Sequence, residues 1–470
     1  MQQQSKSIER YIVLFIPWLL ALACKSDSVL SYFIAWGGSF FIFLITLTGW
    51  VRPIPNDRPI AEQLMRPLFI IQIIFAGYMC CTSIFFFMNT LGYENFKHVF
   101  IHTLNDKDTL GLIAQCQRYY CLGHASFVMG VLIFMNYPVT KKYHIETEKL
   151  ANLLMMLAII SFPLSLLFIA IPGLSQFYYQ FSALSFIAGT LALAFAIPLK
   201  KSANTLICLL LYAFNFYQAL TSGFKEPIII SVLVLGIFLY PTYKKLVAIT
   251  FIPIIFLLFT VLPTYNHIFR ANAWNGDTNS DEASQLALDA ALNGDNSDVE
   301  ETNWDFLVYR LSEIDMFTRF VQSTPKNVGF YGTDLVTQSA VALVPRILWP
   351  SKPITEDLIM QRVYDAGVVN RNSTVSAKPA YIVDAYLSGG DWGIFIFLFA
   401  YGALAQLIAV KAEKLFGGYI LGTALIFSGL FQIMWRGISF EFLFNTIFWS
   451  YISMLLIHKV LISSKILKQV

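Results

Sequence analysis

Two short proline-containing segments of this chain place basic residues where the backbone is stiff. SGFKEP at residues 222–227 contains Lys225, and PRILWPSKP at residues 345–353 contains Arg346 and Lys352. Proline fixes its own φ angle and excludes regular helix, so the second segment is predicted to be extended and rigid. Cations held this way suit a phosphate or another anionic group. The alternative is structural, as a local ion pair for Lys225 and solvated charges for the other two.

A third segment of interest, at residues 378–393, contains the carboxylate of Asp384. Residues 378–393 read KPAYIVDAYLSGGDWG, and Asp384 precedes Gly389, Gly390 and Gly393. The glycines predict a tight turn that leads into an apolar span. Asp384 is the acid best placed in this part of the chain for proton transfer, and capping of the turn is an equally simple role.

Residues 304–323 predict a helix that is apolar on nearly all sides and is therefore buried. Arg310 can pair with Glu313 three residues on, and Arg319 can pair with Asp315 four residues before it. The two arginines are nine residues apart, which is about half a turn around a helix axis. One unbroken helix can therefore direct at most one of them at a bound anion.

Two further arginines lie at predicted membrane boundaries. Arg118 lies inside an apolar window, where a charge requires a partner or a hydrated cavity. Alternatively it extends to the interface beside Tyr119 and Tyr120. Arg436 is followed by Glu441, so it forms either a structural ion pair or an anion contact.

The amino-acid composition is typical of a membrane protein. Of the 470 residues 57% are hydrophobic, 16% aromatic and 13% charged, with a formal net charge of +3. A bilayer core about 30 Å thick requires about 20 apolar residues per helix. The sequence therefore predicts an all-α polytopic integral membrane protein with about twelve transmembrane helices and a large extracytoplasmic loop that contains short helices. The windows are 9–24, 30–49, 67–91, 110–136, 149–171, 179–198, 203–222, 227–242, 246–263, 393–410, 417–435 and 442–459.

The basic residues favour one orientation. Seventeen lysines and arginines fall in one set of alternate connections, and the short connections of the other set hold five. By the positive-inside rule both termini are predicted to be cytoplasmic. The chain then divides into an N-terminal membrane bundle at 1–263, an extracytoplasmic loop at 264–392 and C-terminal membrane helices at 393–470. The expected location is a bacterial inner membrane.

Two features argue against a metal site or a disulfide framework. The six cysteines all lie in or beside apolar windows, where packing is their usual role. Residues 275–303 hold eight acidic residues and no lysine or arginine, but lack the spacing of a calcium-binding loop. We expect this tract to be flexible, and we predict no bound metal and no cofactor.

Taken together, these segments resemble the Wzy-like oligosaccharide repeat-unit polymerases of bacterial surface polysaccharide synthesis. The resemblance lies in SGFKEP, PRILWPSKP and YIVDAYLSGGDWG, in the number of spans and in the large loop before the last three spans. It covers residues 200–400 at the level of motifs and the remainder by hydropathy. Relatives often have arginine where this chain has Lys225, which keeps the positive charge but loses the bidentate guanidinium.

The resemblance implies a metal-independent glycosyltransferase at the outer face of the inner membrane. A glycan on undecaprenyl diphosphate would pass to the terminal sugar of a second lipid-linked unit, which makes a polymer of the O-antigen type. Asp384 and Arg310 would be catalytic. The substrate would be bound by Arg118, Lys225, Arg319, Arg346, Lys352 and Arg436. Its partners would be the undecaprenyl-diphosphate-linked oligosaccharide, membrane lipid and a chain-length regulator protein, with no nucleic acid.

Two other functions fit the same hydropathy profile. An O-antigen ligase uses the same donor with a different acceptor. A flippase for lipid-linked oligosaccharides also has about twelve helices, but transporters commonly contain internal repeats, and the two halves of this chain show no correspondence. A membrane scaffold would explain the spans and leave the proline-fixed cations without a role.

Overall fold

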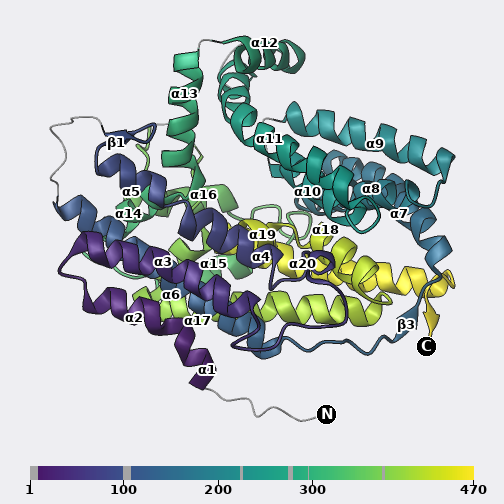
Figure 1. The fold of residues 1–470 in the computed structure, drawn as a ribbon, viewed down its shortest axis with the longest axis horizontal. Coiled ribbons are helices and arrows are strands. Elements are labelled where there is room, and N and C mark those ends of the chain that lie inside the picture. Colours follow the sequence, from purple (N-terminus) through teal and green to yellow (C-terminus); the bar gives the residue numbers. More distant parts are fainter. Residues whose placement is uncertain (1–8, 99–106, 223–225, 274–278, 295, 373–375) are drawn as a thin grey trace.

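The computed structural model describes residues 9–98, 107–222, 226–273, 279–294, 296–372 and 376–470. These residues are predominantly helical (Figure 1). Their strands form two short antiparallel pairs. One pairs β1 (Tyr93–Glu94) with β2 (Lys97–His98), and the other pairs β3 (Tyr143–His144) with β4 (Lys468–Gln469). The prediction of a helical architecture is confirmed for the described residues, apart from these two short strand pairs.

The helices up to residue 273 occur in the following order. They are α1 (Glu9–Ile12), η1 (Val13–Phe15), α2 (Ile16–Ala23), α3 (Ser28–Leu47), η2 (Ile60–Glu62), α4 (Ile70–Gln72), η3 (Ile73–Cys81), α5 (Ile84–Thr90), α6 (Lys107–Phe134), α7 (Thr147–Ala170), η4 (Ser175–Phe177), α8 (Tyr178–Ala196), α9 (Ser202–Leu220), α10 (Glu226–Leu239) and α11 (Lys244–Ala273).

The remaining helices belong to the predicted loop and the C-terminal part. They are α12 (Ser280–Asn293), α13 (Asn296–Asp305), η5 (Phe306–Leu311), α14 (Ile314–Ser323), α15 (Asp334–Leu343), α16 (Thr355–Asp365), α17 (Tyr381–Leu415), η6 (Ile420–Phe427), α18 (Ser428–Leu430), α19 (Ile433–Arg436) and α20 (Phe440–Ser463).

Eight helices of the described part are long and apolar enough to cross a membrane, judged by length and composition. The predicted count of twelve is not confirmed. The eight spans are Ser28–Leu47, Ile70–Thr90, Lys149–Ala170, Ser175–Ala196, Ser202–Leu220, Lys244–Ala273, Tyr381–Leu415 and Phe440–Ser463.

The four other windows differ from these eight for physical reasons. The helix at Glu226–Leu239 has 14 residues and rises about 21 Å, which is less than a bilayer core. The apolar helix at Ile420–Leu430 is shorter still. The first window becomes a short helix with a 3-10 turn in it. The fourth forms the 28-residue α6, whose interior glutamines, arginine and histidine lower its hydropathy.

The segment predicted as a loop at 264–392 is mainly helical. Its first residues continue α11 as far as Ala273, and its last ones already belong to α17, which begins at Tyr381. The helix predicted over 304–323 breaks, because Glu313 adopts a left-handed conformation with φ 56° between η5 and α14. Arg310 and Arg319 therefore belong to separate helices.

The acidic tract forms helices in its described part, where we expected flexibility. Asn279 caps α12 by accepting a hydrogen bond from the backbone N–H of Glu282 at 2.9 Å. Acidic residues in the first turn complement the helix dipole. Ala283 and Ala287 are fully buried against α11, so α12 lies along that helix.

The centre of the bundle is the pair α6 and α17, which lie side by side (Figure 1). Glycines bring the two backbones together. A Cβ atom at Gly130 would collide with the carbonyl oxygen of Phe399, and one at Gly402 with that of Phe127. Small residues at a close helix crossing are typical of packing in membranes, where no hydrophobic force drives helices together.

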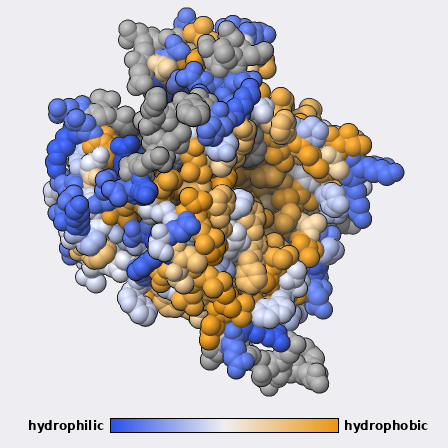
Figure 2. Space-filling view, turned by 60° about the vertical axis from the view of Figure 1, so that its left-hand side comes forward, coloured by the Kyte–Doolittle hydropathy of each residue, from blue (hydrophilic) through white to orange (hydrophobic). Residues whose placement is uncertain are grey.

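Hydrophobic residues cover much of the surface. Figure 2 shows a broad hydrophobic area that is hollowed in its middle and bordered by hydrophilic residues above, below and to the left. On α11, Ile249 is 74% exposed and Phe256 is 72% exposed. Such a surface is too apolar for water and suits contact with lipid.

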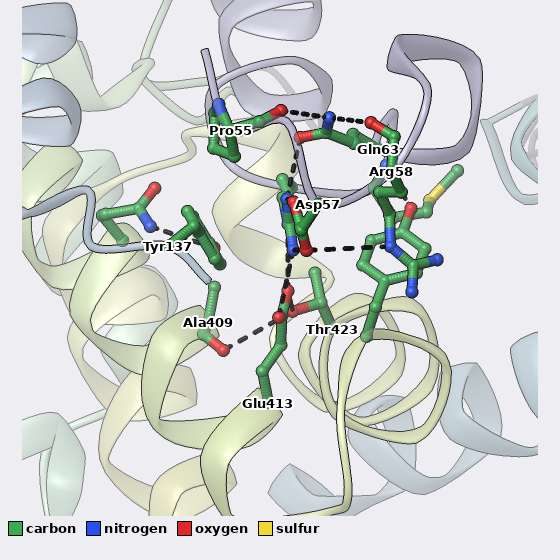
Figure 3. Close-up of polar contacts among 12 residues, drawn as sticks. Pro55, Asp57, Arg58, Gln63, Tyr137, Ala409, Glu413 and Thr423 are labelled. Carbon is green, nitrogen blue, oxygen red and sulfur yellow. Dashed lines mark hydrogen bonds and ion pairs between the residues drawn. The ribbon is translucent and has the colours of Figure 1, made fainter. Parts of the chain in front are cut away.

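A buried ion cluster fixes the C-terminal end of α17. The Arg66 side chain, 1% exposed, contacts Glu413 through Nε at 3.0 Å and Asp57 through Nη2 at 2.7 Å. Gln63 accepts a further hydrogen bond from Nη1 at 2.8 Å, and the guanidinium lies 3.8 Å from the ring centroid of Tyr137. Figure 3 shows Asp57, Gln63, Tyr137 and Glu413 around this position. We call Asp57, Gln63, Arg66 and Glu413 the Glu413 cluster.

The Glu413 cluster connects the proline-rich segment before α4 to α17. Burial alone would lower the pKa of Arg66, but the Asp57 and Glu413 carboxylates outweigh burial and raise it above its usual range. Thr423 donates a hydrogen bond to Glu413 at 3.0 Å, so η6 is tied to the same point.

Replacing Arg66 by methionine is expected to destabilise the protein strongly, because Glu413 would remain buried without a counter-charge. Loss of one partner from a buried pair costs about 3–5 kcal/mol. Thermal unfolding of the detergent-solubilised protein measures the effect. Lys149→Met, which removes an exposed ion pair with Glu146, serves as the control and should leave the melting temperature unchanged. Equal melting temperatures for both variants would contradict this role of Arg66.

Acidification should weaken the Glu413 cluster. The hydrogen bond with Arg66 holds the pKa of Asp57 below its usual value. A carboxyl group with a lowered pKa in the folded state stabilises the fold above its unfolded pKa of about 4, and this contribution is lost as the pH falls further. Unfolding measured from pH 6 to pH 3 should therefore show a steeper loss of stability for the wild type than for Asp57→Asn. Parallel curves would exclude the linkage.

Candidate functional site

A second buried ion cluster lies at the loop end of α17. Arg362 of α16 contacts Asp384 of α17 through Nη2 at 2.9 Å and Glu441 of α20 through Nη1 at 2.7 Å. Its Nη2 also donates to the second Glu441 oxygen at 2.8 Å. The side chains of Asp384 and Glu441 are fully buried, and that of Arg362 is 1% exposed. We call these three residues the Asp384 cluster.

The Asp384 cluster carries two carboxylates for one guanidinium. Burial alone would lower the pKa of Arg362, but the Asp384 and Glu441 carboxylates raise it above its usual range. The backbone N–H of Phe440 donates to Asp384 Oδ2 at 2.9 Å, which offsets part of the negative charge. Asp384 Oδ1 and Arg362 Nε have no partner among the described residues. Together the contacts hold α16 against α17 and α20.

The same region fixes the connection between α19 and α20. Gly437 ends α19 with φ 57°, a conformation that glycine adopts without strain. Its carbonyl oxygen accepts a hydrogen bond from the Tyr381 N–H, and Ile438 forms a β-bridge with Ala380. The connection that carries Arg436 is therefore attached to the first turn of α17.

Arg436 is paired with Glu226 at the start of α10, with Nε 2.6 Å from Oε2. The sequence offered Glu441 as the ion-pair partner of Arg436. Glu441 pairs with Arg362 instead of Arg436, and Glu226 pairs with Arg436 across the fold. Arg436 and Glu226 are each about one-third exposed, so the pair lies at a surface that solvent reaches.

Further charges gather around Tyr78 of η3. The Tyr78 hydroxyl donates to the backbone carbonyl oxygen of Arg310 at 3.0 Å. The Glu226 and Glu313 carboxylates lie near enough to act on this hydroxyl electrostatically. Arg270 of α11 is near enough to Arg310 for their charges to interact. We call Tyr78, Glu226, Arg270, Arg310, Glu313 and Arg436 the Tyr78 cluster.

The Tyr78 cluster has the properties of an anion-binding site. Its three arginines and two glutamates leave a formal excess of one positive charge. The guanidinium of Arg310 is exposed and makes no hydrogen bond or ion pair with any other residue that the structure describes. Five separate helices contribute residues, namely η3, α10, α11, η5 and α19, and the short α14 starts next to Glu313. A planar guanidinium without a protein partner is well suited to bidentate contact with a phosphate group.

The structure places the other predicted ligands elsewhere. Arg118 donates to Ser31 Oγ at 2.8 Å and interacts with the charge of Asp391. It therefore has partners inside the bundle. Arg319 pairs with Asp315 at 3.3 Å, as the helical spacing predicted, and both are partly exposed. Lys225 lies outside the described residues.

Arg346 and Lys352 are occupied by backbone carbonyl groups. Arg346 Nη1 donates to the carbonyl oxygen of Lys352 at 3.0 Å. Lys352 Nζ donates to those of Ala342 at 3.1 Å and Val344 at 2.7 Å. Burial lowers the pKa of Lys352, and the nearby Arg346 lowers it further. The contacts hold the proline-rich segment together, so its role here is structural, but Lys352 is buried and is not the solvated charge that the structural alternative expected.

Sequence reasoning missed Arg362, Arg270 and Tyr78. Arg362 had a detectable signal, because it follows Ile359 by three residues and precedes Val363, both of which are fully buried. It therefore lies on the apolar face of its helix, where a charge demands a partner. Tyr78 and Arg270 have no comparable local signal, since their role depends on segments that are distant in the sequence.

Arg362→Met should lower stability by about 3–5 kcal/mol, because two buried carboxylates would lose their counter-charge. Arg371→Ala is the matched control, since it removes a partly exposed ion pair with Asp365 from the same region. Adding Asp384→Asn and Glu441→Gln to Arg362→Met should recover part of the loss, because the remaining groups are neutral. Thermal unfolding in detergent measures all three proteins. If the triple variant is no more stable than Arg362→Met, the unpaired buried carboxylates are not the cause of the lost stability.

No curated protein and no solved structure matches this chain at a significant level. Residues 16–469 match a family described as a domain of unknown function, DUF8712. The match spans nearly the whole chain and includes both ion clusters and the Tyr78 cluster. The chain therefore belongs to the DUF8712 family.

Proposed function

We propose that this protein is a membrane-embedded polymerase of lipid-linked oligosaccharide repeat units. The observation that carries the proposal is the exposed Arg310, whose backbone carbonyl oxygen is bonded to Tyr78 and whose charge acts on Arg270. Glu226, the ion-pair partner of Arg436, acts electrostatically on the same Tyr78 hydroxyl, so residues from distant parts of the chain meet here. The eight apolar helices and the resemblance of SGFKEP, PRILWPSKP and YIVDAYLSGGDWG to Wzy-like polymerases support it. In this proposal the Tyr78 cluster lies at the outer face of a bacterial inner membrane.

The donor would be a glycan on undecaprenyl diphosphate. A hydroxyl group of the acceptor sugar attacks the anomeric carbon of the donor, and the bond from that carbon to the phosphate oxygen breaks. The electron pair leaves with the lipid diphosphate, which gains negative charge in the transition state. Arg310 is free to contact this group, and Arg436 can exchange Glu226 for it. Charge-assisted hydrogen bonds aimed at developing charge are the main source of catalysis in such a step.

The acceptor hydroxyl must lose its proton during this reaction. Asp384, the base expected from the sequence, is fully buried and bonded to Arg362 and the Phe440 N–H. Glu313 is half-buried and belongs to the Tyr78 cluster. Its left-handed backbone is unfavourable for a residue with a side chain, and such strain concentrates at functional sites. In this proposal Glu313 takes the proton, and Asp384 positions the α19–α20 connection with Arg436.

Removal of the ligand arginines should abolish polymer formation in cells. In a deletion strain of the native host, Arg310→Ala and Arg436→Ala should fail to restore long polysaccharide chains on gels. Each lost charge-assisted contact is worth about 1.5–3 kcal/mol, which corresponds to a roughly 10- to 100-fold slower transfer. Lys378→Ala removes an exposed ion pair with Glu356 and should restore the wild-type pattern.

The same strain separates polymerase from ligase. A polymerase deletion leaves the surface lipid capped by a single repeat unit, and a ligase deletion leaves uncapped lipid with accumulated polymer. Membrane levels of every variant are measured by immunoblot. Wild-type chain lengths for both arginine variants at normal protein levels would refute the proposed site.

Glu313→Gln should slow transfer about 100-fold or more without loss of donor binding, since a general base contributes roughly 10²- to 10⁴-fold. Purified protein in lipid vesicles with lipid-linked repeat units measures the rate. Glu356→Gln, in a partly exposed ion pair of the same segment, is the control and should keep the wild-type rate. A wild-type rate for Glu313→Gln would remove this residue from the mechanism.

A further inference from the structure

We infer that a cleft between the ends of α14 and α16 binds a sugar residue of the glycan. The cleft has a volume of about 280 Å³. It is lined by Arg319, Gln322, Ser323, Lys326, Asn327 and Asp365, together with the backbone of Ala366 and Gly367. It is separate from the Tyr78 cluster and shares no residue with it. The identification of the ligand as this glycan rests on the proposed function.

The side chains that line the cleft include both hydrogen-bond donors and hydrogen-bond acceptors. Arg319 and Lys326 only donate, Asp365 only accepts, and the amides of Gln322 and Asn327 do both. No large apolar side chain lines the cleft. A ligand that fills it must therefore offer many groups that both donate and accept. Hydroxyl groups have this property, and a sugar residue presents several of them on one small ring.

The electrostatics of the cleft disfavour a phosphate group. Asp365 contributes a negative charge beside the two cations Arg319 and Lys326. Both α14 and α16 also end at the cleft, at Ser323 and at Asp365. The C-terminus of a helix carries a partial negative charge of about half an electron. Outside the lining, Asp315 pairs with Arg319 and Arg371 pairs with Asp365, which adds one charge of each sign. The two helix ends and Asp365 therefore approximately balance the two cations, so the cleft has little net attraction for an anion.

The walls of the cleft are held in place before any ligand binds. Tyr386, a buried residue of α17, donates to the carbonyl oxygen of Thr324 at 2.7 Å. The turn that follows is closed by the Asn327 N–H, which donates to Ser323. On the other side, Arg362 anchors α16 one turn before Asp365. A preformed site binds with a smaller loss of conformational entropy.

The position of the cleft relative to the Tyr78 cluster fits an extended glycan. Helix α14 starts next to Glu313, which belongs to that cluster, and ends at the cleft. Its ten residues rise about 15 Å. A donor whose diphosphate lies at Arg310 could therefore place a more distant sugar of the same chain against Arg319 and Asp365.

Direct binding to the full-length protein in detergent tests this inference. The first probe is the repeat-unit oligosaccharide released from its lipid by mild acid, which carries no diphosphate. The wild type should bind it, and Asp365→Asn should weaken binding about 10-fold, because one charge-assisted hydrogen bond is lost. Lys326→Gln should weaken it several-fold. Lys149→Met, which removes an exposed ion pair and is not part of the cleft, should leave binding unchanged.

Inorganic phosphate is the second probe and should not compete with the oligosaccharide. Lys326 is exposed and has no partner among the described residues, so Lys326→Gln tests the site even if Asp365→Asn misfolds. Competition by phosphate, or wild-type affinity in both variants, would overturn the inference. The two proposals can fail separately. If the cleft variants lose oligosaccharide binding but the wild-type protein makes no polymer, the cleft is upheld and the proposed polymerase activity is refuted.

Discussion

The structure depends on one buried guanidinium at each end of α17. Arg66 neutralises Asp57 and Glu413 at the C-terminal end, and Arg362 neutralises Asp384 and Glu441 at the loop end. An ionised group without a partner in such an apolar surrounding would be very costly, so none of these contacts can be opened singly. The segment at residues 57–66, α16 and α20 are thereby tied to α17, which is kinked at Gly389 and Gly390 between the two clusters.

This constraint explains how a site can form between segments that are far apart in the sequence. The Asp384 cluster holds α16 and the start of α20 on α17, and the backbone pairing at Ile438 holds the connection that carries Arg436. The break at Glu313 then places Arg310 and Arg319 on separate helices, η5 and α14.

The arginines of this protein divide into two groups by the partners that they make. Arg66 and Arg362 are buried and bonded to two carboxylates each, and Arg346 is bonded to backbone carbonyl groups. These residues hold the fold together. Arg310 is exposed with its guanidinium unpaired among the described residues, and Arg436 is paired at a surface that solvent reaches. The second group is available to a ligand and the first is not, and burial and pairing, more than residue type, make the distinction.

The sequence by itself determined the features that arise from local composition and spacing. Runs of apolar residues predicted most of the long helices, because a bilayer-length apolar segment has few alternatives to helix. The spacing of Asp315 and Arg319 predicted their ion pair. Only the tertiary structure decided which charges meet. Glu441 is paired with Arg362 instead of Arg436, and Tyr78 joins Arg310, because these contacts depend on how α16, α19 and η3 pack. Ion pairs between segments that are distant in the sequence depend on distance in space, and no local pattern in the chain encodes them.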